Sequence, residues 1–283
     1  MTTTIDSPTG PPTGARPAPP AHPTLAGTFV ALLLRDLTVL RKNLKEFLPR
    51  TILQPLLLVF VFTYVFPKIG QSVGGAQGSA AFSTLLVAGV IGTAILFQGI
   101  QSVALPLVQE FGYTREIEDR VLAPLPIELV AIEKIVAGAL QCLISALIVF
   151  PIAKFVPATP VDLKITWWVL LTLAPLACVF SASIGLLFGT VFQPRTVPLL
   201  FGVIIVPMTF LGCVYYSWQS LEPIPWLQYA VLINPLVYIC EGFRAALTPV
   251  DHMPLPIIYG VIVVGTVAAA TVAIRFFQRR VIT

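Results

Sequence analysis

The sequence predicts an all-α integral membrane protein. It has an amphipathic interfacial helix near the N-terminus, six transmembrane helices, and a re-entrant helical hairpin between the fifth and sixth. Of 283 residues, 57% are hydrophobic and 11% are charged, whereas soluble domains carry about 45–50% apolar and about 25% charged residues. A globular protein of this length does not need such an excess to build a core, so the additional apolar surface must face lipid. The apolar runs lack the alternation of transmembrane strands, which favours helices.

The N-terminal part divides into two segments. Residues 1–23 contain seven prolines and no apolar run, so we expect a disordered cytoplasmic tail. Thr24 is a candidate N-cap for a helix over 24–48. Its apolar positions recur at helical spacing, at Phe29, Leu33, Leu37, Leu40, Leu44 and Leu48. Its charged positions fall on the other side, at Arg35, Arg41, Lys42, Lys45 and Glu46. Such a helix, placed just before an apolar span, is expected to lie in the membrane interface.

Six apolar segments follow, and together they predict a transmembrane domain over 51–274. They cover 51–66, 82–108, 132–153, 167–191, 198–217 and 256–274. Each approaches or exceeds the roughly 20 residues that a helix needs to cross the hydrocarbon, although the first is short. Residues 275–283 are then a basic cytoplasmic tail.

The distribution of basic residues predicts the orientation. Thirteen of the 17 Lys and Arg residues fall on one side of the predicted membrane. These are Arg16, Arg35, Arg41, Lys42, Lys45, Arg50, Arg115, Arg120, Lys134, Arg195, Arg275, Arg279 and Arg280. The other side has Lys68, Lys154, Lys164 and Arg244. The positive-inside rule therefore predicts a multi-pass protein of the cell membrane with both termini in the cytoplasm. Because the basic residues form no stripe, we expect no nucleic-acid partner.

The sequence lacks the motifs of nucleotide and zinc hydrolases. It contains no Gly-Lys dipeptide, so it cannot form the phosphate-binding loop of a nucleotide hydrolase, and it has no H-E-x-x-H motif. The four cysteines are widely spaced within apolar runs and the two histidines stand apart. We therefore expect buried, reduced thiols and neither a metal site nor a cofactor.

The predicted cytoplasmic loop over 109–127 is dense in charge. It reads QEFGYTREIEDRVLAPLPI. Arg115 with Asp119, and Glu116 with Arg120, are spaced i,i+4 and are compatible with a short charged helix. Two interpretations stand, a docking element for a cytoplasmic partner and a solvated connector.

Small residues recur every four positions in the fourth span, at Ser181, Gly185 and Gly189. This spacing lets helices approach closely, either within the subunit or between subunits. The glycines of the second span, Gly89, Gly92 and Gly99, carry the same two interpretations.

The segment 218–248 predicts the re-entrant hairpin. Its apolar run over 226–240 is short for a crossing and is interrupted by Asn234-Pro235, where the residue before proline disfavours helix. Glu241 and Arg244 are three apart on one helix face. A charge near hydrocarbon is costly unless paired, so we expect these two to be paired near the extracytoplasmic rim, against the alternative of two solvated loop charges. Pairing with each other predicts that a charge-swapped double variant recovers part of the activity.

With these motifs the chain resembles the membrane permeases of ABC-2 type exporters of drugs, lipo-oligosaccharides and polysaccharides. The resemblance covers nearly everything after residue 24 and rests on the entry helix, the spans, the loop REIEDRVLAPLP and the segment NPLVYICEGFRAAL. It implies a homodimer or related heterodimer of permeases in membrane lipid, with two copies of a separate ATP-binding cassette subunit. It also implies two groups of site residues. The ATPase would be received by Glu110, Tyr113, Arg115, Glu116, Glu118, Asp119 and Arg120, and the extracytoplasmic gate would include Asn234, Pro235, Glu241 and Arg244.

Three function classes remain to be compared. The first is a permease subunit without enzymatic activity that exports a drug, lipid or lipid-linked glycan. The alternative is an integral membrane lipid-modifying transferase, which needs clustered acids or histidines near the interface. Only Glu116, Glu118 and Asp119 cluster in this way, and they fit a solvated helix. A purely structural anchor does not explain the broken segment after the fifth span.

Overall fold

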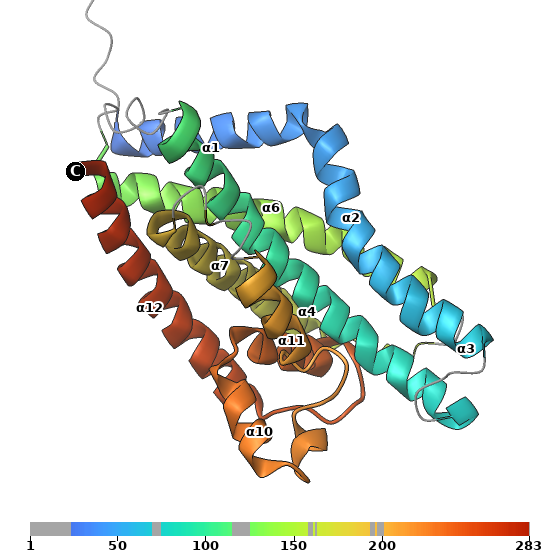
Figure 1. Cartoon of the computed structure of the whole chain (residues 1–283). Helices are drawn as coiled ribbons and strands as arrows, with labels where there is room; N and C mark the ends of the chain where they lie inside the picture. Colours follow the sequence, from blue (N-terminus) through green and yellow to red (C-terminus); the bar gives the residue numbers. More distant parts are fainter. Residues whose placement is uncertain are drawn as a thin grey trace, which may run out of the picture.

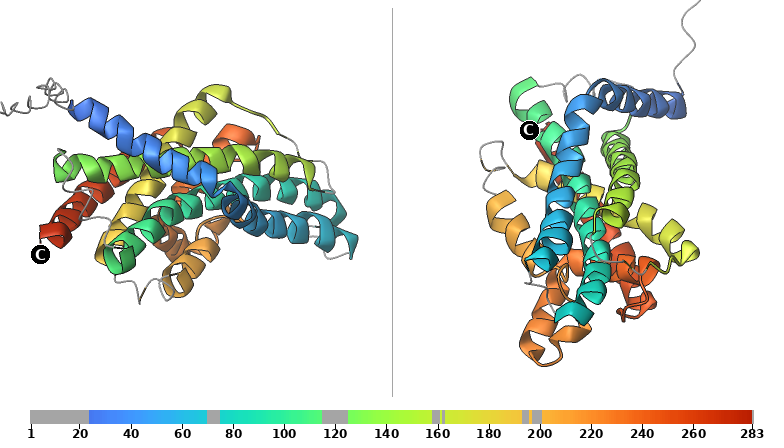
Figure 2. Two further views of the ribbon diagram at one scale, coloured as in Figure 1. Left: turned by 90° about the horizontal axis from the view of Figure 1, so that it is seen from above. Right: turned by 90° about the vertical axis from the view of Figure 1, so that its right-hand side faces the viewer.

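The computed structural model describes residues 24–69, 75–114, 125–157, 161, 163–192, 196 and 201–282. The predicted tail over 1–23 and the middle of the predicted coupling loop, 115–124, lie outside this part of the chain. The long helices form one bundle, and α1 (Leu25–Lys42) lies across one end of it (Figures 1 and 2). Five helical segments in the described residues are long and apolar enough to cross a membrane: Leu44–Val65, Ala81–Gly112, Ile127–Ile152, Trp167–Val191 and Leu255–Arg280.

The entry helix begins where the sequence predicts and ends earlier. The side chain of Thr24 accepts a hydrogen bond from the backbone N–H of Gly27 at 3.2 Å, so the predicted N-cap is confirmed. The helix expected to reach residue 48 ends at Lys42, and after a turn at Asn43 the chain starts α2 (Leu44–Phe60). Asparagine disfavours helix interiors because its side chain competes for backbone groups. Leu44 and Leu48 therefore belong to the first span, which continues through the π-helical turn η1 (Val61–Val65) into α3 (Phe66–Lys68).

The centre of the bundle is the pair formed by α4 (Gly75–Gln109) and α7 (Trp167–Val191). A Cβ atom added to Gly99 would lie 2.3 Å from the Cβ of Ser181, and one added to Gly185 would lie 2.8 Å from the carbonyl oxygen of Gly99. Gly189 packs in the same way against Ala104 and Leu107. The small residues of the predicted fourth span thus serve packing within the subunit, one of the two interpretations above.

Helix α6 (Ile127–Phe155) and helix α12 (Leu255–Ile282) complete the set of long helices. Helix α6 packs on α4 and α7, and α12 packs mainly on α7. The predicted sixth span and basic tail form one continuous helix, so the tail expected from residue 275 is helical as far as Ile282. Much of the outer face of α12 exposes apolar side chains, such as Val264 and Val267, as expected of a helix that contacts lipid.

The predicted fifth span, 198–217, differs most from the structure. Its described helical part consists of the π-helical turn η4 (Phe201–Ile205) and α9 (Val206–Phe210). The helix ends there because the chain turns back onto α11 (Pro235–Leu247). A Cβ on Gly212 would lie 2.4 Å from the Leu236 side chain, and Cys213 has a positive φ of 53°. Apolar composition alone does not reveal such a turn.

The following segment contains the predicted break. After the short turn η5 (Gln219–Leu221), helix α10 (Pro225–Ala230) and turn η6 (Val231–Ile233) lead to Asn234, where the chain bends by 99° into α11. Helix α11 has 13 residues, or about 20 Å of length at 1.5 Å per residue, which is too short to cross the hydrocarbon. Its backbone is tied to the segment before α7, since the N–H groups of Lys164 and Thr166 donate to the carbonyls of Leu247 and Ala246.

We predict that Gly99→Ala destabilises the bundle by about 1–3 kcal/mol, the usual cost of overpacking a core. The added methyl group has no room beside Ser181. Gly260→Ala is the matched control, because nothing lies within 4 Å of a Cβ at this helical glycine and alanine is favoured over glycine in a helix. The measurement is the melting temperature of the purified chain in detergent. Equal melting temperatures for both variants would contradict the packing assigned to Gly99.

Candidate functional site

Two clusters of buried polar groups lie at opposite ends of the bundle. We call the end that holds α1, the π-helical turn η2 (Glu110–Thr114) and the C-terminus of α12 the α1 end (Figure 1). The end that holds α3, α10 and the linker 248–254 is the α10 end (Figure 1). Each cluster brings together segments that are distant in sequence.

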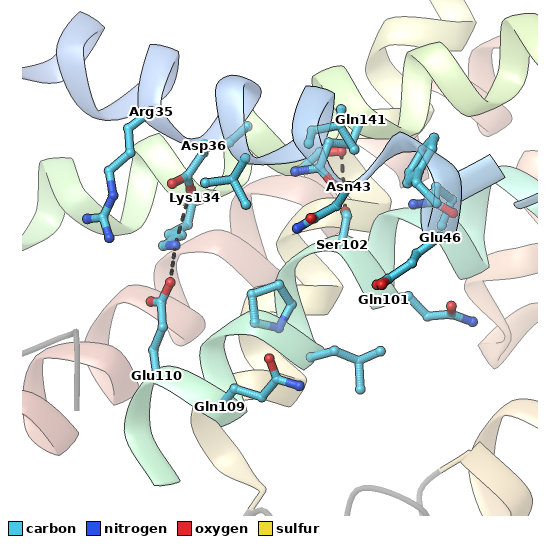
Figure 3. Close-up of a pocket in the computed structure, with 18 residues that line it drawn as sticks. Arg35, Asp36, Asn43, Glu46, Gln101, Ser102, Gln109, Glu110, Lys134 and Gln141 are labelled. Atoms are coloured by element: carbon cyan, nitrogen blue, oxygen red, sulfur yellow. Dashed lines mark hydrogen bonds and ion pairs between the residues drawn. The ribbon is translucent and has the colours of Figure 1, made fainter. Parts of the chain in front are cut away.

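A buried lysine organises the α1 end. The Nζ atom of Lys134, near the start of α6, lies 2.7 Å from Oε1 of Glu110 and 3.2 Å from Oδ2 of Asp36. Figure 3 shows the three side chains meeting between α1, α4 and α6. Lys134 and Glu110 are 5% and 7% exposed, and neighbouring Glu133 is fully buried. A charge in such a position is tolerated because it is paired.

The cluster joins both sides of the predicted coupling loop to the entry helix. Glu110 is the first residue after α4, Lys134 lies in α6 directly beyond the loop, and Asp36 comes from the middle of α1. Of the predicted coupling residues, Glu110 belongs to this cluster and Tyr113 lies in η2. Arg115, Glu116, Glu118, Asp119 and Arg120 lie outside the described residues.

Asp36 and Lys134 were not predicted as site residues. Two signals in the sequence could have found them. Asp36 lies on the half-buried side of α1 together with Leu33, Leu37 and Leu40, so it interrupts an apolar face. Lys134 follows Glu133 inside a stretch that is otherwise apolar. A buried ionisable residue in a membrane span indicates a partner, but the sequence does not show which one.

Arg280 fastens α12 to the same end. Its Nη1 atom donates hydrogen bonds of 3.0–3.1 Å to the carbonyls of Gly189, Thr190 and Phe192, where α7 ends. Its guanidinium lies 4.5 Å from the ring centroid of Phe111 in η2, a cation–π distance. The carbonyls at a helix C-terminus lack intrahelical hydrogen-bond donors, and Arg280 supplies a donor at the end of α7. Its contact with Phe111 connects η2 to α12.

A polar cavity opens beside the lysine cluster. It has a volume of about 630 Å³ and is bounded by α1, α2, α4 and α6. Figure 3 shows its lining, in which amide side chains predominate between the lysine cluster and Glu46. A narrower pocket continues from it along α2 and α4 past Thr51 and Gln98, whose side chains share a hydrogen bond of 3.2 Å.

Glu241 and Arg244 organise the α10 end. Both side chains are fully buried in α11 and form an ion pair with each other. The predicted pairing is therefore confirmed, and the alternative of two solvated charges is wrong. Glu241 also accepts hydrogen bonds from two backbone N–H groups, those of Trp218 at 2.8 Å and Met253 at 2.9 Å. One carboxylate thus ties α11 to the segment before it and to the linker after it.

Arg244 completes the network from the opposite side. Its Nη2 atom donates to the carbonyls of Cys213 at 2.9 Å and Tyr216 at 3.4 Å, and its Nε atom has no hydrogen-bond partner in the described chain. Arg244 thereby connects α11 to the turn that follows α9.

Asn234 and Pro235 set the start of α11. The side chain of Asn234 caps the helix by accepting from the N–H of Leu236 at 3.0 Å, and its amide donates to the carbonyl of Met208 in α9 at 2.7 Å. Pro235 takes the first helical position, where its missing N–H costs nothing. All four residues predicted for the gate lie at α11, two at its start and two in the buried network.

The four cysteines lie in the interior of the described chain. Cys142, Cys178, Cys213 and Cys240 are free and buried, which confirms the prediction that these thiols are buried. Among the described residues, no group of three His, Cys, Asp or Glu side chains could hold a metal ion.

The region that matches a known protein family includes both clusters. The family model of ABC-2 type transporters matches residues 28–248. The chain is 28% identical over 234 residues to the inner membrane transport permease YadH of Escherichia coli K12, covering 81% of this chain and 88% of that protein. The proteins of the same name from Escherichia coli O157:H7 and Shigella flexneri match with the same identity and coverage.

We predict that Glu241→Gln and Arg244→Gln each destabilise the chain by about 3–5 kcal/mol, because each leaves a buried charge without its partner. Glu222→Gln is the control, since Glu222 is exposed on the same side of the molecule. The readout is the melting temperature in detergent.

The structure also revises the expectation for the charge-swapped double variant. Glu241 accepts from fixed N–H groups, and Arg244 donates to fixed carbonyls. A swap would point a guanidinium at donors and a carboxylate at acceptors. The double variant should therefore be no more stable than either single variant, and recovery to the wild-type melting temperature would contradict the role of the backbone partners.

Proposed function

The chain belongs to the ABC-2 type transporter family, and from that premise we propose that it is the membrane-spanning permease subunit of an ATP-driven exporter. Its substrate would be a hydrophobic or amphipathic molecule, such as a drug, a lipid or a lipid-linked glycan, taken from the cytoplasm or the inner leaflet. The sequence has no phosphate-binding loop, so ATP hydrolysis belongs to a separate subunit. The observation that carries the proposal is the buried Lys134 cluster, which connects the base of a charged loop to three helices.

We propose that residues 109–127 receive the ATPase. Lys134 contacts Glu110 at the start of the loop and Asp36 on α1, so a displacement of the loop would act on α1, α4 and α6 together. Arg280 extends the same connection to α7 and α12 through Phe111 and the carbonyls after Gly189. A contact between the ATPase and the loop would therefore act on α1, α4, α6, α7 and α12 together.

The α10 end would form the extracytoplasmic gate. The bend at Asn234, the short length of α11 and the buried Glu241–Arg244 network support a re-entrant hairpin over 218–248. Because backbone groups of two segments, 213–218 and the linker 248–254, bind the Glu241–Arg244 pair, we expect the hairpin to move as one unit.

The assembly would contain two permease copies, identical or related, and two ATPase subunits within membrane lipid. Helix α1 would lie in the cytoplasmic interface, and both termini would be cytoplasmic. The α1 end carries α1 and the C-terminus of α12 (Figure 1), the two described elements richest in Lys and Arg. This asymmetry supports the orientation by the positive-inside rule.

Coexpression with a candidate ATP-binding cassette subunit tests the function. The purified chain alone should show no ATPase activity and should copurify with the ATPase. Replacing Glu116 and Arg120 by Ala should reduce copurification at least about tenfold, as expected for loss of about 1.4 kcal/mol or more of binding energy. Membrane insertion should not change, because neither residue lies in a span. Robust ATP hydrolysis by the chain alone would overturn the proposal, and an unchanged yield would return the loop to a solvated connector.

Labelling of single cysteines in intact cells tests the orientation. The four native cysteines are buried, so an introduced thiol is the accessible one. Cysteines at Lys68 and Lys164 should react with a membrane-impermeant maleimide from outside, whereas cysteines at Arg41 and Arg195 should react only after the membrane is permeabilised. The reverse pattern would invert the topology and place the charged loop on the wrong side for an ATPase.

A further inference from the structure

We propose that the cavity between α1, α2, α4 and α6 is a binding site for the uncharged, hydroxyl-rich headgroup of an amphiphile. The inference rests on the proposed permease function, because it places a ligand site within one subunit at the α1 end. It also narrows the class of ligand from hydrophobic molecules in general to those with a neutral polyol group.

The size and position of the cavity suit such a headgroup. A volume of about 630 Å³ falls within the roughly 300–1,000 Å³ of ligand pockets. The cavity lies where the chain turns from α1 into α2 at Asn43. A ligand there would have its polar part beside α1, which we place in the membrane interface.

The lining is rich in groups that both donate and accept hydrogen bonds. Six such side chains are Asn43, Gln98, Gln101, Ser102, Gln109 and Gln141. An amide offers two donors and an acceptor, and a hydroxyl offers both functions as well. The side-chain amides of Asn43, Gln109 and Gln141 make no hydrogen bond with the described residues, so they are available to a ligand. Figure 3 shows amides on both sides of the cavity, from α4 and from α6.

The charges at the cavity disfavour an anionic ligand. The carboxylates of Asp36 and Glu110 both contact Lys134, so this end is already paired. Arg35 and Glu46 bring one further charge of each sign to the lining. With three acids and two bases in total, the cavity offers an anionic headgroup no excess of positive charge. The amide side chains are uncharged and favour neither a cationic nor an anionic ligand.

One wall is apolar and completes the match to an amphiphile. Val39 and Leu40 of α1, Phe47 of α2 and Leu105 of α4 line the cavity. Sugars and related polyols combine hydroxyl edges with C–H faces, and apolar side chains pack against such faces while the amides bind the edges. The narrower pocket past Thr51 extends the polar lining along α2.

Protection of a single cysteine from labelling tests the site. The full-length chain carrying Gln141→Cys is placed in lipid nanodiscs and labelled with a fluorescent maleimide, while Gln278→Cys serves as the control. Gln278 is half-buried like Gln141, lies at the same end and does not line the cavity. Four probes are compared below their micellar concentrations: octyl glucoside, glucose, octyl phosphate and octyltrimethylammonium.

Octyl glucoside should slow the labelling of Gln141→Cys about fourfold when present at about three times its dissociation constant, and should leave Gln278→Cys unchanged. Protection by glucose alone at similar concentrations would assign the site to a free sugar and overturn the amphiphile. Equal or stronger protection by the phosphate or the ammonium probe would overturn the neutral headgroup. Absence of protection by all four probes would overturn the site itself.

A second variant tests the amide lining. Adding Gln101→Leu to Gln141→Cys should abolish the protection by octyl glucoside and leave the unprotected labelling rate unchanged. Gln109 is exposed, so Gln109→Leu should leave the fold unchanged and should weaken the protection. Full protection in both variants would contradict the role of the amides. The labelling needs no ATP and no ATPase, so its failure leaves the permease proposal standing, whereas failure of copurification leaves the binding result standing.

Discussion

Gly99 and Gly185 allow the backbones of α4 and α7 to touch, and the remaining long helices are arranged around that pair. Helices in lipid gain little from burying apolar surface against one another, so close backbone approach supplies much of the attraction. Helix α4 uses glycine again where Gly92 faces Cys240 of α11. The same helix contacts α6 and α2. A side chain at Gly99 or Gly185 would separate α4 from α7 and shift the elements that carry both charged clusters.

Both clusters compensate buried charges, but they do so with different kinds of partner. A buried charge must find a partner in the protein because lipid offers none. The Glu241–Arg244 pair is satisfied mainly by backbone groups, which are fixed by the chain itself, so it suits a rigid closing element. Lys134 is satisfied by side chains from two other elements. Such contacts can lengthen or exchange when helices shift, so this cluster suits a coupling role.

The sequence predicted the class of fold, the N-cap at Thr24, the break at Asn234 and the pairing of Glu241 with Arg244, because each depends on local pattern or on a general cost. It did not predict the end of α1 at Asn43 or the turn after Phe210. Helix α1 ends at a residue of low helix propensity, Asn43. The turn after Phe210 is set by a tertiary contact, Gly212 against Leu236, which overrides apolar periodicity. The sequence did not predict the Lys134 cluster or the polar cavity beside it for the same reason, since their residues come from helices far apart in the chain.

Pro106 of α4 lies near both the polar cavity and Glu110. Helix α4 is 35 residues long, about 50 Å at 1.5 Å per residue, so it reaches from one cluster toward the other. Pro106 lies in its last turn before Glu110, and a proline removes one backbone hydrogen bond and weakens the helix there. The helix is therefore weakened one turn before Glu110, in a region where Leu107 still packs against Gly189 of α7. Ser102 and Pro106 both line the polar cavity. In the proposed exporter, a contact at the coupling loop that moved Glu110 would therefore act on the Lys134 cluster and on this cavity together.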